Sequence, residues 1–461
     1  MENNTQLKEM IRSMVIDVLQ GQKQEAASSQ PFKQAPRGQV EPGVFDTVDE
    51  AIQAAKAAQA RFEDCTLATR EKVIADIRAA MRPRVQELAQ KTVEETGMGR
   101  VADKVLKLNL TLDKTPGVED LVTECETGDN GMTLYELSAY GVIGAITPST
   151  NPAETLICNT IGMLAAGNAV FFSVHPGAKH LSRLLVSELN QIIAKSIGIE
   201  NLIVTLREPS IESAQEMMLH PDVSLLVVTG GPGVVKQALQ SGKKVIGAGA
   251  GNPPAFVDET ADIKKAAQDI VLGASLDNNI LCIAEKSVVA MRQIEPQLVQ
   301  EMVKAGCVLI ENQQDIQRLV DLTVLPNGTP NKKFVGKNAS VILDAAHIPY
   351  NGDPRLIIMR TPKDHPFAVI EMLMPILPVV TVDSFDEGLD VCLMLEAGLH
   401  HTATMHSLNM ERLNRMARKM KTSIFVKNGP SYAGLGFSGE GTTTFTIATP
   451  TGESTTSARC F

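Results

Sequence analysis

Among the seven cysteines of this sequence, Cys282 stands out because it follows a polar, turn-prone segment. That segment is GASLDNNILCIA, residues 273–284, in which Asp and Asn favour a turn. Cys158 and Cys392 lie in apolar helical runs and Cys460 lies near the end of the sequence, so we interpret these three as packing or peripheral residues. Cys282 is therefore the candidate nucleophile.

The chemistry that a cysteine in this setting could perform is attack on an aldehyde. The resulting thiohemiacetal carries an oxyanion, which needs donors such as a backbone N–H and an amide side chain before a hydride can leave. Asn151 follows a predicted strand and can supply the amide. Cys282 and Asn151 are far apart in the sequence, so only the fold can bring them together.

Composition narrows the class of protein. The cysteines include no CxxC pair, which argues against a disulfide framework or a zinc site and indicates a reducing compartment. The net charge of -10, without clustered Lys and Arg, argues against a nucleic-acid partner. Because no apolar run is long enough to cross a membrane and no secretory signal is present, we expect a soluble protein that is not exported. The length predicts two principal domains.

Apolar runs alternate with helical segments in the middle of the chain. Near-continuous apolar strands separated by helices predict a parallel sheet buried on both faces, and such sheets bind nucleotides beyond the carboxyl ends of their strands. The predicted strands are 140–147, 169–175, 202–208, 224–230 and 244–250, and the predicted helices are 153–166, 178–196, 211–219 and one beginning near 234.

Small and polar residues at three of these strand ends are the candidate cofactor contacts. Glycines before a helix N-terminus expose backbone N–H groups to a pyrophosphate. Glycines after a strand are more often plain turn residues, so GGPG alone is a weak signal that gains weight from the series of strands. The candidates are Thr147, Pro148, Ser149, Thr150, His175, Pro176, Gly177, Thr229, Gly230, Gly231 and Gly233.

The first 19 residues have the spacing of an amphipathic helix. Its apolar stripe consists of Leu7, Met10, Ile11, Met14, Val15, Val18 and Leu19. Residues 20–42 are rich in Gln, Ala, Ser, Pro and Gly, a composition typical of a flexible linker. The helix could pack on its own protein or on a neighbouring subunit, or it could dock in a groove of another protein. The stripe is too weakly basic to indicate membrane binding.

Several motifs resemble those of the aldehyde dehydrogenase superfamily. PSTNP (148–152), VTGGPG (228–233), GAGAGNPP (247–254), the Cys282 segment and EMLMPILPVV (371–380) occur in the order of that superfamily. The chain from about 43 onwards resembles its coenzyme A-acylating branch, in particular the propionaldehyde and acetaldehyde dehydrogenases of bacterial microcompartments. This second resemblance is carried by ETGMG (95–99), TPGVEDL (115–121), HHTA (400–403), TSIFVKNGP (422–430) and ATPTGE (448–453).

The resemblance implies an α/β, aldehyde dehydrogenase-like fold. It implies a Rossmann-type parallel-sheet cofactor domain at 43–246, an α/β catalytic domain at 247–440, and small oligomerisation strands at 128–141 and 441–461, hence a homodimer or tetramer. Residues 1–19 resemble the encapsulation peptide of such enzymes. They would bind a shell protein and place the enzyme in the lumen of a bacterial microcompartment, within the cytoplasm.

The same resemblance assigns roles to individual residues. Cys282 would form the thiohemiacetal and then the thioester, while Asn151 and the Cys282 backbone amide hold the oxyanion. Glu371 matches the carboxylate that contacts the nicotinamide ribose, and His175 stands where many relatives have a lysine near the adenosine ribose. Gly247, also a candidate cofactor contact, stands where hydrolytic relatives have the glutamate that activates water. Its presence predicts slow hydrolysis and acyl transfer to coenzyme A.

The implied reaction is oxidation of a short aliphatic aldehyde with NAD, followed by ping-pong acyl transfer to coenzyme A. Propionaldehyde is the expected substrate and acetaldehyde the alternative, and the preference between NAD and NADP stays open. One alternative is a hydrolytic dehydrogenase, which Gly247 disfavours, and another is a silent shell-associated scaffold, which Cys282 with Asn151 disfavours. His400 and His401 could help to deprotonate the incoming thiol, but we favour structural hydrogen bonding for them.

Overall fold

The computed structural model describes residues 41–461, so the predicted helix at 1–19 and nearly all of the linker at 20–42 lie outside it. The first of its two large sheets has six strands in the order β1-β6-β5-β4-β7-β8, all parallel. These strands are β1 (Val44–Phe45), β4 (Val142–Thr147), β5 (Ala169–Val174), β6 (Ile203–Leu206), β7 (Val223–Thr229) and β8 (Lys244–Ala248). The predicted parallel sheet is confirmed, and the two-residue β1 extends its edge.

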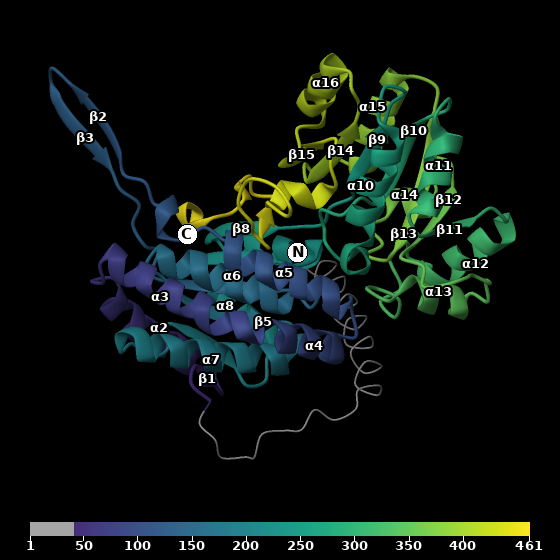
Figure 1. Cartoon of the computed structure of the whole chain (residues 1–461). Coiled ribbons are helices and arrows are strands. Elements are labelled where there is room, and N and C mark those ends of the chain that lie inside the picture. The colour runs from purple at the N-terminus through teal and green to yellow at the C-terminus, as the bar shows by residue number, and fades with distance from the viewer. Residues whose placement is uncertain (1–40) are drawn as a thin grey trace, which may run out of the picture. The chain divides into compact units, whose positions relative to one another are not determined.

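The first sheet is covered by helices from two parts of the chain (Figure 1). The helices between its strands are α6 (Pro152–Ala165), α7 (Lys179–Ile197), α8 (Ile211–Leu219) and α9 (Pro232–Leu239). Those before it are α2 (Val48–Phe62), α3 (Leu67–Met81), α4 (Val85–Thr96) and α5 (Val101–Lys114). The helix α6 is buried on all sides, because the sheet, α5 and α7 surround its apolar sequence.

The second sheet has seven parallel strands in the order β11-β12-β13-β10-β9-β14-β15. These strands are β9 (Pro254–Val257), β10 (Ser287–Met291), β11 (Cys307–Ile310), β12 (Leu356–Arg360), β13 (Ile376–Val382), β14 (Thr402–His406) and β15 (Ile424–Lys427). Its helices are α10 (Ile263–Ser275), α11 (Glu295–Lys304), α12 (Gln313–Thr323), α13 (Ala339–Ala345), α14 (Pro366–Val369), α15 (Phe385–Glu396) and α16 (Met410–Met420). Each sheet has its own buried apolar core.

An exposed hairpin projects from the part of the chain that holds the first sheet (Figure 1). It consists of β2 (Glu124–Gly128) and β3 (Gly131–Tyr135), which pair antiparallel. The strand expected within 128–141 is present as β3, and the turn-favouring residues Asp129 and Asn130 join it to β2, which was not expected. The strands of the C-terminal segment, β16 (Ile447–Ala448) and β17 (Ser454–Thr455), pair with each other and not with the hairpin.

The C-terminal segment returns to the first domain. β16 lies beside β8, and the side chains of Ala458 and Phe461 belong to the core of the first sheet. Gly247 lies within β8, so the first sheet includes the residue at which we placed the start of the catalytic domain. All seven cysteines are free. Within residues 41–461, the helices are all too short or too polar to span a bilayer.

Candidate active site

The candidate site lies where four neighbouring strands of the second sheet begin. Gly251, Cys282, Glu371 and His401 precede β9, β10, β13 and β14, and these strands are adjacent in the order β13-β10-β9-β14. The amino ends of parallel strands meet at one edge of a sheet, so the topology gathers residues that are distant in the sequence. A Cβ on Gly251 would lie 2.7 Å from the Cys282 carbonyl oxygen and 2.8 Å from the His401 ring. Only glycine fits there.

A left-handed turn holds the approach to Cys282. Three consecutive residues, Asp277, Asn278 and Asn279, have positive φ angles of 50°, 56° and 67°. This conformation is unfavourable for residues with a side chain, although Asn and Asp tolerate it best. The Asn278 amide donates to the carbonyl of Gly336, and the Asn279 amide donates to the carbonyls of Ala274 and Glu285. These bonds hold the turn against its backbone strain.

Lys286 stabilises the same turn from within the protein. Its buried ammonium donates to the Asn279 carbonyl at 2.8 Å, to Asn279 Oδ1 at 2.6 Å and to the Leu281 carbonyl at 2.8 Å. Burial lowers the pKa of Lys286 to about 8, although the charges of Glu371 and Cys282 oppose this fall. Lys286 thus places a positive charge next to the nucleophile, a feature that our sequence analysis missed.

Cys282 is partly exposed, as a nucleophile must be, yet its environment disfavours the thiolate. Burial, together with the charge of Glu371, raises the pKa of the Cys282 thiol to about 12, and the charge of Lys286 opposes this rise. The carboxylate of Glu371 accepts the Gly251 N–H at 3.1 Å. Burial also raises the pKa of Glu371, against the charge of Lys286 and the Gly251 N–H. Cys282, Glu371 and Lys286 therefore form one electrostatic group.

The acids around Cys282 bear on whether water could attack a thioester. Glu285 is three residues away, but its carboxylate accepts the N–H and the hydroxyl of Ser431, each at 2.8 Å. Burial raises the pKa of Glu285 to about 7. Glu371 is engaged by Gly251, as described above. Gly247 itself lies in β8, where its N–H donates to Thr451 Oγ1 at 2.9 Å. Both acids near the nucleophile are thus already hydrogen-bonded to the protein.

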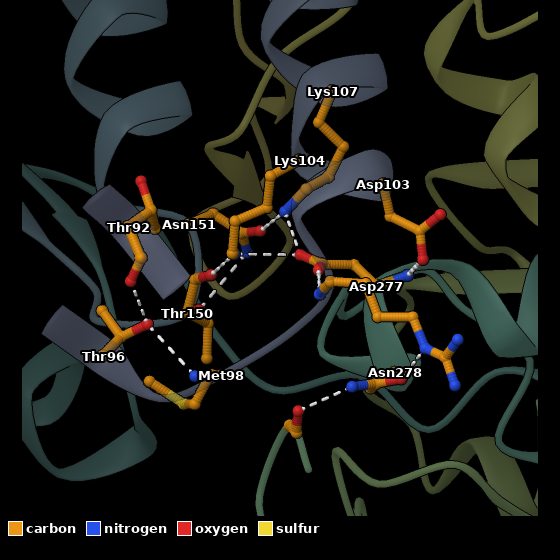
Figure 2. Close-up of polar contacts among 12 residues, drawn as sticks. Thr92, Thr96, Met98, Asp103, Lys104, Lys107, Thr150, Asn151, Asp277 and Asn278 are labelled. Carbon is orange, nitrogen blue, oxygen red and sulfur yellow. Dashed lines mark hydrogen bonds and ion pairs between the residues drawn. The ribbon is translucent and has the colours of Figure 1, made fainter. Parts of the chain in front are cut away.

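Asn151 lies beyond the carboxyl end of β4, at the start of α6, and is buried. Its Oδ1 accepts a hydrogen bond of 2.5 Å from the ammonium of Lys107 on α5. The same ammonium lies 2.5 Å from an Asp277 carboxylate oxygen, in the turn that leads to Cys282. Figure 2 shows these contacts between Asn151 and Asp277. The fold therefore connects the predicted oxyanion donor to the nucleophile's turn through one buried cation.

The two histidines differ in their surroundings. His401 is buried. Its backbone N–H donates to the Glu396 carboxylate, and its ring Nδ1 lies 3.0 Å from the Thr402 hydroxyl. Burial lowers the pKa of His401 to about 4, aided by the charge of Lys286, so its ring is neutral at pH 7. His401 Nε2 is buried without a hydrogen-bond partner in the described structure. His400 is exposed. The contacts of His401 support the structural interpretation.

The first sheet presents a nucleotide-type edge. Its strand order reverses between β4 and β7, whose carboxyl ends carry Thr147 and Thr229. Gly231 and Gly233 at the N-terminus of α9 are exposed, and a Cβ at either position would meet open space. The Thr147 hydroxyl is buried without a partner in residues 41–461. An exposed helix N-terminus and an unsatisfied hydroxyl suit a dinucleotide phosphate, so these residues fit NAD.

The remaining predicted cofactor contacts have more ordinary surroundings. Pro148, Ser149 and Thr150 are partly exposed between β4 and α6, and His175, Pro176 and Gly177 are exposed after β5. The Nδ1 of His175 accepts the Gly177 N–H at 3.0 Å, a local turn contact. The Thr229 hydroxyl is 2.9 Å from that of Thr446, and the Gly230 N–H donates to the Ala248 carbonyl. The Thr229 and Gly230 contacts connect the edge to neighbouring strands.

Comparisons with known proteins show what the chain is similar to. The profile of the aldehyde dehydrogenase family matches residues 18–448. A propanal dehydrogenase (CoA-propanoylating) of Salmonella typhimurium is 51% identical over 100% of this chain and 97% of its own. The structure of a Rhodopseudomonas palustris propionaldehyde dehydrogenase with bound CoA and an acylated cysteine has a TM-score of 0.90 at 49% identity, covering 91% of this chain and 96% of that one.

A second solved structure resembles the chain equally well. It is a propionaldehyde dehydrogenase from the fucose utilisation bacterial microcompartment of Clostridium phytofermentans. Its TM-score is 0.90 at 48% identity, and the match covers 91% of this chain and 97% of that one. The likeness thus extends over most of the chain.

Proposed function

Because the chain belongs to the aldehyde dehydrogenase family, we propose that it oxidises a short aliphatic aldehyde to the corresponding acyl-CoA, with NAD and coenzyme A as co-substrates. One observation carries the proposal: Cys282 is partly exposed at the strand edge, while the acids near it, Glu285 and Glu371, already accept hydrogen bonds from the protein. A thioester on Cys282 would thus face carboxylates that are already engaged by the protein, which weakens them as bases for the attack of water.

The chemistry proceeds on the sulfur of Cys282. The thiolate adds to the carbonyl carbon, forming a C–S bond, and the Asn151 amide and the Cys282 N–H stabilise the oxyanion. NAD, when bound, accepts the hydride that leaves this carbon. The resulting thioester is attacked by the thiol of coenzyme A, which loses its proton as Cys282 leaves as thiolate. Aldehyde, NAD⁺ and coenzyme A thus give acyl-CoA, NADH and one proton.

Propionaldehyde is our preferred substrate. The relatives named for propanal or propionaldehyde match nearly the whole chain, at sequence identities of 51% and 49%. Initial rates with two-, three- and four-carbon aldehydes test the preference, and a three-carbon optimum in kcat/KM is expected. A higher kcat/KM for acetaldehyde would reassign the substrate without altering the reaction class.

The reaction class is tested by following reduced nicotinamide with propanal and NAD, with and without coenzyme A. We expect continuous turnover only when coenzyme A is present, with propionyl-CoA as the product. Equal turnover without coenzyme A, giving propionate, would instead establish the hydrolytic alternative. A chain that gives no signal in either mixture would contradict both enzymatic readings and favour a scaffold.

The location in a bacterial microcompartment is also part of the proposal. A relative with the same fold comes from such a compartment, and residues 1–19 have the apolar spacing of a docking helix. Ile11→Glu, on the apolar stripe, should abolish co-purification with shells and preserve activity. Arg12→Glu, on the polar face, is the matched control and should co-purify as the unaltered chain does. Retention of the Ile11→Glu variant in shells would refute this role.

A homo-oligomer completes the proposal. The hairpin of β2 and β3 is exposed along its length, and Met132, Leu134 and Tyr135 are each more than half exposed. Monomeric proteins rarely leave a long apolar edge uncovered. We therefore assign the hairpin to contact with a second copy of the chain.

A further inference from the structure

The side chain of Asn151 does not cap the helix that begins next to it. An Asn at the start of a helix usually accepts a backbone N–H of the first turn through Oδ1. Asn151 is the N-cap of α6, yet its side chain makes no capping hydrogen bond. Its Oδ1 is instead occupied by Lys107 Nζ, at 2.5 Å. The helix therefore gives up a stabilising bond, and α5 supplies a different partner for the amide.

The nature of that partner determines which way the amide faces. A lysine ammonium donates hydrogen bonds and cannot accept one, so only the oxygen of the Asn151 amide can face Lys107. The Nδ2 group must then point to the other side. One of its two hydrogens reaches the Thr150 hydroxyl at 3.3 Å, and the second is free to serve an oxyanion.

Lys107 is itself held firmly. Its buried ammonium lies 3.0 Å from Glu154 and 2.5 Å from Asp277, so α5, α6 and the Cys282 turn meet at one cation. Burial lowers the pKa of Lys107, but Asp277 and Glu154 outweigh burial and keep the pKa above its ordinary value, so the group is charged at pH 7. A charge buried in this way also polarises the amide that it contacts.

Lys104 provides a natural comparison on the same helix. It is equally buried and also pairs with Asp277, at 3.0 Å, but its other contact is the Thr150 carbonyl and not the Asn151 side chain. Figure 2 shows both ammonium groups reaching Asp277 from α5. The two lysines thus share their burial and one anionic partner, whereas Lys107 in addition contacts Asn151 and Glu154.

We propose that Lys107 is a positioning residue for the reaction: it fixes the Asn151 amide with its N–H toward the substrate oxygen and strengthens that N–H as a donor. This inference rests on the proposed function, in which Asn151 stabilises the oxyanion. It predicts that the loss of Lys107 slows the steps in which the oxyanion forms, with little change in KM.

The test compares kcat for acyl-CoA formation in Lys107→Met and Lys104→Met. Each variant removes one buried positive charge beside Asp277. Loss of an oxyanion donor lowers kcat by about 10²–10³. Because Lys107→Met leaves the donor in place but misoriented, we expect its kcat to be lower than that of Lys104→Met by at least about tenfold. Lys107→Gln, which retains a donor without the charge, should recover part of the activity. Thermal unfolding and alkylation of Cys282 establish that each variant retains the folded site.

A double-mutant cycle with Asn151→Ala separates positioning from general damage. If Lys107 acts through Asn151, Lys107→Met should change kcat by less than about threefold in the Asn151→Ala background, because coupled residues are strongly non-additive. Equal losses in Lys107→Met and Lys104→Met, or an undiminished loss in the Asn151→Ala background, would overturn the inference. If the unaltered enzyme forms no acyl-CoA, the proposed function itself is refuted. That outcome differs from the ones that overturn the role of Lys107, so the two can be told apart. If Lys107→Met does not fold, the same comparison is made with Lys107→Gln.

Discussion

The reactivity of Cys282 is controlled by charges that the strand edge brings around it. An ordinary cysteine has a pKa of about 8.5. Burial raises the pKa of Cys282 to about 12, Glu371 contributes to the rise, and Lys286 counteracts it. The protein's own groups therefore favour the thiol at neutral pH. A change in this balance of charge would shift the candidate nucleophile toward its thiolate.

Replacing Glu371 with Gln should lower the pKa of Cys282, because a nearby negative charge disfavours the thiolate. At pH 8, below the pKa, the thiolate fraction and the rate of alkylation by iodoacetamide should rise by about threefold to tenfold, which corresponds to at most about one pKa unit. Glu285→Gln is the matched control, because its amide can still accept from Ser431. An alkylation rate in Glu371→Gln equal to that of the control would remove Glu371 from this role.

Gly247 permits a direct test of whether the missing carboxylate disfavours hydrolysis of the thioester. A Cβ at this position would lie 2.9 Å from Val235 Cγ1, so a glutamate needs space that Val235→Ala provides. The double variant Gly247→Glu/Val235→Ala should raise the ratio of free acid to acyl-CoA by at least about tenfold, because general-base catalysis accelerates a reaction by about 10²–10⁴-fold. Gly247→Gln with Val235→Ala fills the same space without a base. Equal product ratios in the two double variants would argue against this explanation.

At the scale of elements, the left-handed turn before β10 determines where the nucleophile lies. Its three residues pay a conformational cost that their side-chain hydrogen bonds offset. Asn279 contributes three of these contacts, because its amide donates to two carbonyls and its Oδ1 accepts from Lys286. The turn is thus stabilised by side chains more than by backbone preference.

Substitution of Asn279 should separate the two contributions. Asn279→Gly loses the side-chain bonds but tolerates a φ of 67°, whereas Asn279→Ala loses the bonds and adds a backbone cost of about 1–2 kcal/mol. Urea unfolding should therefore give midpoints in the order unaltered chain, Gly variant, Ala variant. If the Ala variant were as stable as the Gly variant, the left-handed geometry of this residue would be wrong.

The pattern of apolar residues along the sequence predicted the strands of the first sheet well. All five strands expected between 140 and 250 are present, because strands buried on both faces appear as uninterrupted apolar runs. The polar turn before Cys282 was likewise evident from its Asp and Asn residues. The first strand of the hairpin was not predicted, because Glu124–Gly128 is exposed throughout and has no apolar alternation.

The buried lysines were not predictable in this way. Lys104 and Lys107 are three residues apart on an otherwise amphipathic helix, where charged residues normally face solvent. Their burial depends on Asp277 and Glu154, which come from other parts of the chain. Lys286 gave one usable signal, because a charged pair, Glu285 and Lys286, directly precedes the fully buried strand β10.

At the scale of the molecule, the hairpin determines assembly in our proposal. Met132 and Leu134 lie on one face of β3, because successive side chains of a strand alternate. Met132→Glu with Leu134→Glu should give a smaller species by analytical ultracentrifugation, since charge on an apolar contact face opposes burial. Thr133→Glu, on the other face, is the control and should assemble normally. An unaltered sedimentation coefficient in the double variant would exclude this face from the contact.

The return of the C-terminal segment also has a consequence for biosynthesis. Phe461 is buried against α6, and its carbonyl accepts the Asn168 amide across a separation of 293 residues. A ribosome that has made only the half with the first sheet has therefore not yet supplied the side chains that close this core. Contacts so distant along the chain form slowly. The first half synthesised would thus be among the last to mature, and a nascent chain would need protection from aggregation until translation nears residue 461.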